Sequence, residues 1–265
     1  MIDSHLHLQD PDFAGKVDEI IRSLRAIGVT RLVVNGTSEA DWSEVARIAD
    51  DYPEVIPCYG IHPWWEKEAS PGWRETLRGL LEKYPKAGVG EVGVDRWVRG
   101  HDIDRQRTIL RDQLDLAQEM DRPVMIHCLR AWGHLGECLD QSSYRRPFLL
   151  HSFGGPSEVV EEYVERGAYF SLSGYFFRED KKSKLEAWES VPTERILLET
   201  DAPDMLPPEK WIEFPWEGES GREAVNHPAN LRGVYRAFAA WKGWSEEKLS
   251  KQVEENFTRF LLGWV

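Results

Sequence analysis

Short apolar runs that end in a histidine, glutamate or aspartate recur along the whole 265-residue chain. The polar residues at these ends are His5, His7, Glu91, His127, His151 and Asp201. The runs are rich in Val, Ile and Leu and are followed by turn-forming residues, a pattern typical of strands buried on both faces of a parallel sheet. In a barrel of parallel strands, all carboxyl ends face one mouth, so these six side chains are predicted to converge there.

The order of strands and helices predicts the fold class. The predicted strands lie at 2–8, 31–37, 55–63, 87–95, 123–128, 148–153, 168–174 and 196–201, and segments with apolar residues at helical spacing lie at 17–24, 42–49, 110–117 and 159–164. Strand and helix alternate along nearly the whole chain, which predicts an α/β fold. Eight repeats favour a closed (β/α)8 TIM barrel of parallel strands over an open doubly wound sheet. A last helix, from Ser245 to Leu262, begins with a serine cap and would close the ring.

Length and composition fit a single cytoplasmic domain. The 265 residues are close to the usual size of one (β/α)8 domain, so one domain spanning 1–265 is predicted, with its active site at the C-terminal mouth. His5 and His7 interrupt any apolar run of a signal peptide, and no segment approaches the ~20 apolar residues of a membrane span. The three cysteines lack paired spacing, which suits a reducing compartment. We expect a cytoplasmic protein with no membrane association and no obligate protein partner.

The six residues at the strand ends have the chemistry of a metal site. His5 and His7 are two residues apart, so on a strand both rings project from the same face. Each of the six alone has an ordinary structural explanation, such as a hydrogen-bonded barrel histidine or a helix cap. Burying four imidazoles and two carboxylates together is costly unless divalent cations compensate. This donor set favours zinc, manganese, iron or cobalt over magnesium, which prefers oxygen ligands.

Eight blocks along the chain resemble those of the TatD-like metal-dependent hydrolases, TIM barrels related to the amidohydrolase superfamily. The blocks are DSHLHL at 3–8, GIHP at 60–63, GEVGVD at 90–95, QLDLAQEMDRPVMIHCLRA at 113–131, HSFGG at 151–155, LLETDAP at 197–203, NHPANL at 226–231 and ENFTRFL at 255–261. The resemblance implies two divalent metal ions per subunit. One would be held by His5, His7, Glu91 and Asp201, and the other by Glu91, His127 and His151, so that Glu91 bridges them. Magnesium-supported nuclease activity in the family adds Mg to the candidate metals Zn and Mn.

The implied activity is hydrolysis of a phosphodiester by a hydroxide that the two metal ions activate. Glu91 and Asp201 are the candidate catalytic residues, and Asp201 would orient the water and accept its proton. His62 and Arg130 lie at the same predicted mouth and are candidates for contact with a phosphate. Asp95 is expected to hold an imidazole or a loop.

Charge limits the kind of nucleic acid that such an enzyme would accept. A formal charge of −13 argues against an extended nucleic-acid-binding surface, and the mainly acidic segment 204–223 should repel a long polyanion. Basic residues at 96–107 and 178–184 offer a local strip, and Trp64, Trp65, Trp97 and Trp132 follow strand ends, where an indole can stack on a base or pack a loop. The first hypothesis is a deoxyribonuclease, an exonuclease acting on DNA ends or single strands.

Three alternative functions remain open. The first is a phosphoesterase for small substrates. The second is an ester, lactone or amide hydrolase of the amidohydrolase type, although Glu91 stands where such enzymes usually have a bridging carboxylated lysine. The third is a non-catalytic metal-binding barrel, although the complete ligand set weighs against it.

Overall fold

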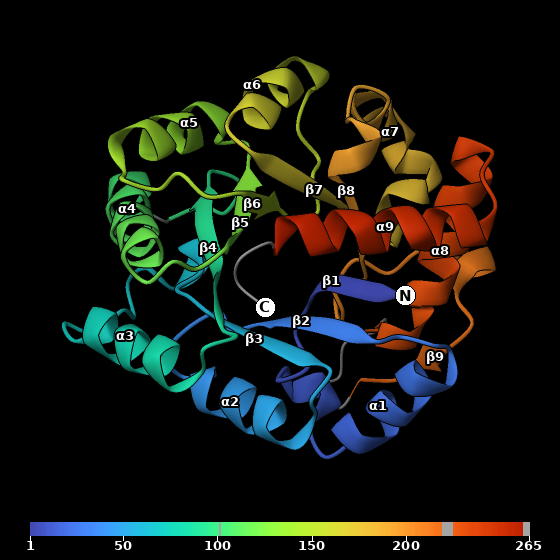
Figure 1. The fold of residues 1–265 in the computed structure, drawn as a ribbon, viewed down its shortest axis with the longest axis horizontal. Helices are drawn as coiled ribbons and strands as arrows, with labels where there is room; N and C mark the ends of the chain where they lie inside the picture. The colour runs from blue at the N-terminus through green and yellow to red at the C-terminus, as the bar shows by residue number, and fades with distance from the viewer. Residues whose placement is uncertain (101, 219–224, 262–265) are drawn as a thin grey trace.

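Eight parallel strands follow one another around a barrel in chain order (Figure 1). The structure, a computed structural model, describes residues 1–100, 102–218 and 225–261. The strands are β1 Ile2–Leu6, β2 Arg31–Asn35, β3 Val55–Tyr59, β4 Gly88–Asp95, β5 Val124–Leu129, β6 Phe148–Leu150, β7 Ala168–Ser173 and β8 Ile196–Glu199. Each lies within or overlaps its predicted run, and the (β/α)8 TIM barrel is confirmed.

The first and last strands meet and complete the ring. The Asp201 N–H donates to the His5 carbonyl over 3.0 Å, and the His7 N–H donates to the Ala202 carbonyl over 2.8 Å. The Ser4 hydroxyl donates to the Leu198 carbonyl over 2.9 Å. These bonds place β1 beside β8, so that His5 and His7 face Asp201.

Helices surround the barrel, and the last of them runs across one of its ends (Figure 1). They are α1 Val17–Ala26, α2 Trp42–Asp51, α3 Trp73–Lys83, α4 Ile103–Glu119, α5 Trp132–Gln141, α6 Val160–Glu165, α7 Lys182–Trp188, α8 Leu231–Lys242 and α9 Glu246–Phe260. In α1, for example, the buried side chains are Val17, Ile20, Ile21 and Leu24. A two-stranded antiparallel ribbon, β9 Pro215–Trp216 and β10 Val225–Asn226, follows β8. None of the helices that the structure describes has both the length and the apolar character needed to span a bilayer.

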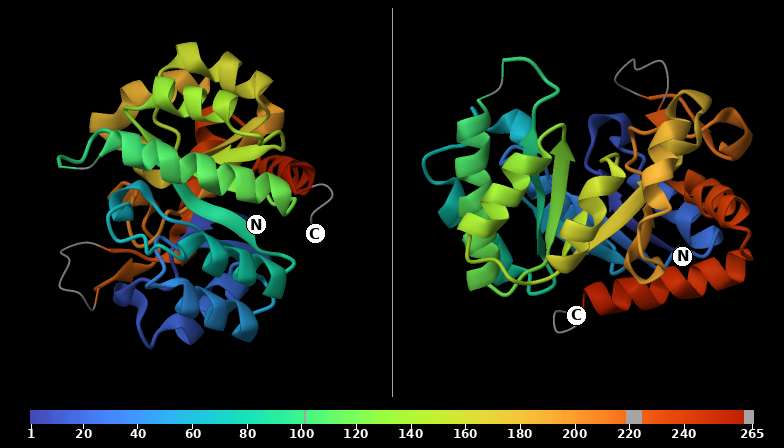
Figure 2. Two further views of the ribbon diagram at one scale, coloured as in Figure 1. Left: turned by 90° about the vertical axis from the view of Figure 1, so that its left-hand side faces the viewer. Right: turned by 90° about the horizontal axis from the view of Figure 1, so that it is seen from above.

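One helix, from Ser245 to Leu262, was predicted after the last strand, whereas the structure has two, α8 and α9. α8 packs against β8, and α9 runs beneath the ends at which the strands begin (Figure 2, right). The Ser245 hydroxyl accepts a hydrogen bond from the Lys248 N–H over 3.1 Å, which confirms the predicted cap. The predicted end of this helix, Leu262, lies outside the described residues. α9 therefore closes the bottom of the barrel, opposite the candidate site.

Asn256 fixes α9 to the barrel, and its loss is expected to destabilise the fold. The buried Asn256 Nδ2 donates to the carbonyl oxygens of Thr193 and Ile196, both over 2.8 Å. Asn256→Ala should lower the free energy of unfolding by about 2 kcal/mol or more, because it leaves buried carbonyl oxygens unpaired. Urea denaturation measures this change. Thr258→Ala on the exposed face of α9 is the control, with an expected change of less than about 0.5 kcal/mol; equal changes in both variants would contradict the assignment.

Close pairing of β4 with β5 brings Glu91 and His127 onto adjoining strands. Gly93 pairs with His127 in register. A Cβ atom on Gly93 would lie 1.9 Å from the His127 carbonyl oxygen, so only glycine allows this approach. All eight residues of β4 are buried, as expected for a strand covered on both faces.

Candidate metal centre

The structure brings all six predicted ligands together at the C-terminal mouth of the barrel. They lie within or just after five strands. His5 lies in β1, Glu91 in β4 and His127 in β5, whereas His7, His151 and Asp201 follow the last residues of β1, β6 and β8. All six side chains are largely buried, with exposed fractions from 0% for His5 to 15% for His127. Three groups of side chains in this region have ligand atoms close enough to hold a metal ion: His5 with His151 and Glu199, His5 with His7 and Asp201, and His62 with Glu91 and His127.

Glu91 lies at the centre of the cluster, and its two oxygens face different histidines. Oε2 is 3.3 Å from the Nε2 atoms of both His5 and His7. Oε1 is 3.2 Å from His127 Nδ1 and 2.8 Å from His151 Nε2. The carboxylate thus joins two separate pairs of imidazole nitrogens, which is the placement expected of a bridging ligand.

Asp201 completes the side of the cluster formed by β1. Its Oδ1 is 3.6 Å from the Nε2 atoms of both His5 and His7, and its Oδ2 accepts a hydrogen bond from the Ser152 hydroxyl over 3.3 Å. The Asp201 backbone has φ +53°, in the left-handed region that residues with a side chain rarely adopt. Its N–H bond to His5 holds this conformation, and strain of this kind is concentrated at functional sites.

Hydrogen bonds set the tautomers of two histidines. His7 Nδ1 lies 2.8 Å from the Asn35 carbonyl oxygen, which can only accept, so Nδ1 carries the proton. His127 Nε2 lies 3.0 Å from Asp95 Oδ2 and donates to that carboxylate. In the neutral forms, His7 Nε2 and His127 Nδ1 therefore turn their lone pairs toward Glu91. An imidazole held in this way from its far nitrogen is the usual arrangement of a metal ligand.

His5 and His151 form the middle of the cluster. Their rings stack with centroids 3.9 Å apart and planes at 12°. Each directs Nε2 toward Glu91, whereas neither Nδ1 has a hydrogen-bond partner among the described residues. Four imidazole nitrogens and the carboxylate oxygens of Glu91 and Asp201 thus converge in one buried volume, a donor set that fits divalent transition metals.

Without a cation, protonated imidazoles would balance the carboxylates. Burial opposes ionisation of Glu91, but the nearby imidazoles of His151, His62 and His5 hold its pKa well below the usual range. Burial lowers the pKa of His127, but Asp95 and Glu91 outweigh it and raise that pKa to about 9. A cation binding at His127 must displace this proton, so metal affinity should rise with pH.

His62 lies in the same cluster in a different role. Its Nδ1 accepts the Trp64 backbone N–H over 3.1 Å, so the proton of the neutral ring is on Nε2, 3.3 Å from Glu91 Oε1. Burial lowers the pKa of His62, which favours the neutral ring. His62 is thus placed to donate a hydrogen bond to Glu91. Its predicted contact with a phosphate, like that of Arg130 at the exposed rim, stays a prediction.

Two acidic residues support the cluster from behind. Asp95 holds the His127 imidazole and also accepts the Trp97 N–H over 2.6 Å, as expected for its role. Glu199 was missed by the sequence analysis. It is fully buried, accepts the Ser152 N–H over 2.7 Å and lies 3.8 Å from His151 Nδ1, and burial raises its pKa to about 7. Its signal in the sequence was its position at the end of the apolar run Ile196–Glu199, two residues before Asp201.

The predicted basic strip is weaker than the sequence indicated. Arg105 and Arg107 belong to α4, and Arg107 pairs with Glu137 over 2.7 Å. After β7, Lys182 pairs with Glu179 over 2.6 Å. The acidic segment is partly neutralised as well, because Glu213 pairs with Arg232 and Arg236. Residues 219–223 of that segment lie outside the described residues.

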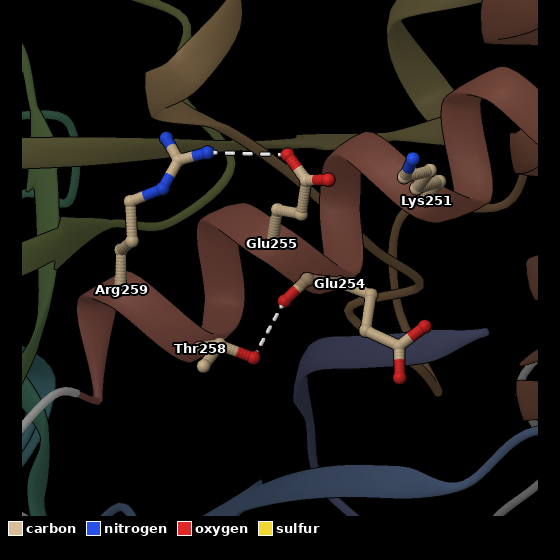
Figure 3. A pocket seen from close by; sticks show the side chains of 5 residues that line it. All are labelled: Lys251, Glu254, Glu255, Thr258 and Arg259. Atoms are coloured by element: carbon tan, nitrogen blue, oxygen red, sulfur yellow. Dashed lines mark hydrogen bonds and ion pairs between the residues drawn. The ribbon is translucent and has the colours of Figure 1, made fainter.

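A separate hollow of about 460 Å³ lies along α9, at the opposite end of the barrel (Figure 3). Its side chains largely bond to one another: Arg259 pairs with Glu255 over 3.2 Å, and the Thr258 hydroxyl donates to the Glu254 carbonyl over 2.8 Å. None of the six predicted ligands lines it. The chemistry of this chain is therefore concentrated at the mouth.

Comparisons with known proteins support the fold and indicate the family. Residues 2–262 match the family described as TatD related DNase. The chain is 29% identical to the 3'-5' ssDNA/RNA exonuclease TatD of Pantoea ananatis, covering 97% of each chain, and 29% identical to Deoxyribonuclease TATDN3 of Homo sapiens, covering 88% of each. The crystal structure of the TatD homologue YjjV of Escherichia coli superposes with a TM-score of 0.87 at 26% identity, over 98% of this chain and 97% of that one.

Proposed function

The chain belongs to the TatD-related DNase family and is a metal-dependent hydrolase of the TatD type, and we propose that it hydrolyses phosphodiester bonds at the ends of single-stranded nucleic acid with two divalent metal ions. The single observation that carries the proposal is the position of Glu91, whose two oxygens face separate pairs of histidines. A carboxylate placed in this way suits two cations better than one.

The residues divide into two sets around Glu91. His5, His7 and Asp201 would hold one ion with Glu91 Oε2, and His127 and His151 would hold the second with Oε1. When bound, divalent cations at such a site acidify water and neutralise phosphate oxygens. The imidazole-rich donor set favours Zn or Mn, with Mg as the family's further candidate.

Asp201 is the proposed proton acceptor. Burial would raise its pKa, but hydrogen bonding to His7 and the charges of His151 and His5 hold that pKa far below the usual range, so the carboxylate is ionised at neutral pH. The Ser152 hydroxyl donates a hydrogen bond to Asp201 Oδ2 over 3.3 Å. This bond fixes the direction from which the carboxylate can receive a proton. Water attacks phosphorus, Asp201 takes one of its protons, and the bond from phosphorus to the leaving oxygen breaks. The departing alkoxide takes up a proton from solvent, so that the products are an alcohol and a phosphomonoester.

The electrostatics of the chain favour strand ends over long duplexes. A net charge of −13 opposes the many phosphate contacts on which extended nucleic-acid binding depends. The Pantoea relative is named for single-stranded DNA and RNA and the human relative for DNA, and both names agree with this proposal.

Asp95 should tune metal affinity without being a ligand. Asp95→Ala removes the carboxylate that fixes the His127 tautomer, so affinity for the ion on that side is expected to fall about 10- to 100-fold. Competition with a chromophoric chelator measures this affinity. Asp104→Ala, on the exposed surface of α4, is the matched control. Equal affinities in the two variants would show that Asp95 does not orient a ligand.

A substrate panel tests the proposed function. End-labelled single-stranded DNA, the same sequence as a blunt duplex, a small phosphodiester, a phosphomonoester and a lactone are offered to the metal-loaded enzyme. The proposal expects the highest kcat/KM on the single strand, with label released as short products from an end. Turnover of the lactone or the phosphomonoester alone would instead support the alternative hydrolase functions.

A further inference from the structure

Among residues 1–100, 102–218 and 225–261, three tryptophans are exposed, and two of them form a pair at the mouth. Trp64 follows β3 and is 40% exposed, and Trp97 follows β4 and is 54% exposed; Trp65, at 39%, is the third. The rings of Trp64 and Trp97 lie with centroids 6.5 Å apart and planes at 30°. We name this pair the aromatic platform. Its exposed, nearly parallel rings offer the surface on which a flat aromatic ligand can stack.

The aromatic platform is joined to the candidate metal centre through a single carboxylate. Asp95 Oδ2 accepts the Trp64 indole N–H over 2.7 Å and the His127 N–H over 3.0 Å, and Asp95 Oδ1 accepts the Trp97 backbone N–H over 2.6 Å. The Trp64 ring lies 6.4 Å from the His127 ring. A ligand on the platform is therefore held at a fixed position beside the candidate metal centre.

A hollow of about 170 Å³ next to the platform carries uncompensated positive charge. Arg96, Arg130, Trp132, His134 and Glu137 are among the residues that line it. Within residues 1–100, 102–218 and 225–261, no ion pair is formed by Arg96 or Arg130, whereas Glu137 is already paired with Arg107 over 2.7 Å. We name this the arginine hollow. Two guanidinium groups suit the oxygens of a phosphate.

We propose that the aromatic platform stacks an unpaired base at the end of a nucleic-acid strand, and that the arginine hollow holds a phosphate of the same strand. This inference rests on the proposed function and deepens it by naming what the mouth recognises. Arg96 and Trp97 are consecutive, so the cationic and aromatic surfaces adjoin each other. A small phosphoester without a base would leave the platform unused.

The geometry selects unpaired strands. In a duplex, the faces of the bases are covered by their neighbours, whereas a base at a single-stranded end is free to stack on an indole. Stacking works with any base, so little sequence preference is expected. The few positive charges of the arginine hollow fit a short end, in agreement with the net charge of −13.

The affinity of the Trp97→Ala variant for oligonucleotides tests whether the aromatic platform stacks a base. Trp97 touches Asp95 only through its backbone N–H, so this change leaves the support of His127 in place. With EDTA-treated protein, fluorescence anisotropy compares a ten-residue oligothymidylate with an abasic oligomer carrying the same number of phosphates. Trp97→Ala should weaken binding of the thymidylate roughly 5- to 50-fold and binding of the abasic oligomer less than about twofold. Trp65→Ala, the matched exposed control, should change neither by more than about twofold.

Salt dependence tests the arginine hollow. Arg130→Met should weaken binding of both oligomers equally and reduce the slope of log K against log salt by about 0.7, the value for one phosphate contact on a single strand. Arg22→Met, on the outer surface at α1, should leave the slope unchanged. An unchanged slope in Arg130→Met would overturn the assignment of the arginine hollow.

The outcomes separate this inference from the proposed function. If Trp97→Ala bound each of the two oligomers as tightly as the wild-type protein does, the platform would be overturned, even if the enzyme cleaves DNA. Cleavage of the same oligomers is then measured with metal restored. A wild-type protein that prefers the thymidylate but cleaves neither oligomer would contradict the proposed function and leave the platform standing.

Discussion

Replacement of Glu91 by glutamine is expected to lower kcat/KM for single-stranded DNA by more than about 100-fold and to reduce the metal content below two ions per chain. Glutamine keeps the shape of the side chain but loses the charge. Its single carbonyl oxygen can face only one pair of histidines, and its NH2 group must point toward the nitrogens of the other pair. Loss of one supporting carboxylate behind a ligand already costs about 10- to 100-fold, so loss of a ligand shared by two ions should cost more.

Metal content by plasma mass spectrometry and steady-state rates on end-labelled DNA measure this prediction. Glu54→Gln is the matched control, because its carboxylate is also largely buried but pairs with Arg25 at the end of the barrel where β3 begins. Glu91→Gln with two bound ions and wild-type activity would show that Glu91 is not the bridging residue.

Replacement of Asp201 by asparagine is expected to remove the proposed proton acceptor while leaving the ion on the side of His127 and His151 in place. The rate constant kcat should fall by about 10²- to 10⁴-fold, the usual contribution of a general base. Asparagine tolerates the left-handed backbone at this position, so the fold should be kept. The ion on the side of His127 and His151 should remain, because neither residue depends on Asp201 for its approach to Glu91.

The measurement pairs single-turnover cleavage with metal analysis of the same sample. Asp140→Asn, an exposed residue paired with Arg166 on the outer surface, controls for the change from aspartate to asparagine. If Asp201→Asn retained kcat within threefold of the wild type, the proton acceptor would have to be another group. If it lost both ions, Asp201 would be primarily structural.

Much of this fold could be predicted because its strands carry two signals at once. Apolar runs identified the strands, and a polar residue at the end of a run identified the mouth, so His5, Glu91 and Asp201 could be grouped before any coordinates were considered. Helices with a clear apolar stripe, such as α1, were also predicted. α3, α5, α7 and α8 were not predicted; in α5, Gly133 and Gly136 weaken the helical pattern.

The supporting contacts could not be predicted, for physical reasons. The Asn35 carbonyl that sets the His7 tautomer is a backbone atom, which every residue has. The bond from the Trp64 indole to Asp95 joins two loops whose relative position depends on the closed barrel. The ion pair with Glu137 also neutralises Arg107, whose charge was expected to be part of a basic strip. Sequence indicates which groups meet at the mouth, whereas their hydrogen bonds and net charges depend on tertiary structure.

The most direct test of the central claim is a metal titration of stripped protein that counts bound ions and follows cleavage of end-labelled single-stranded DNA in the same samples. Manganese, zinc and magnesium are each added back. We expect no cleavage without metal, and cleavage that rises to its maximum as the second ion per chain binds. Full activity with metal removed, or two tightly bound ions with no cleavage of any phosphodiester, would contradict a two-metal phosphodiesterase built around Glu91.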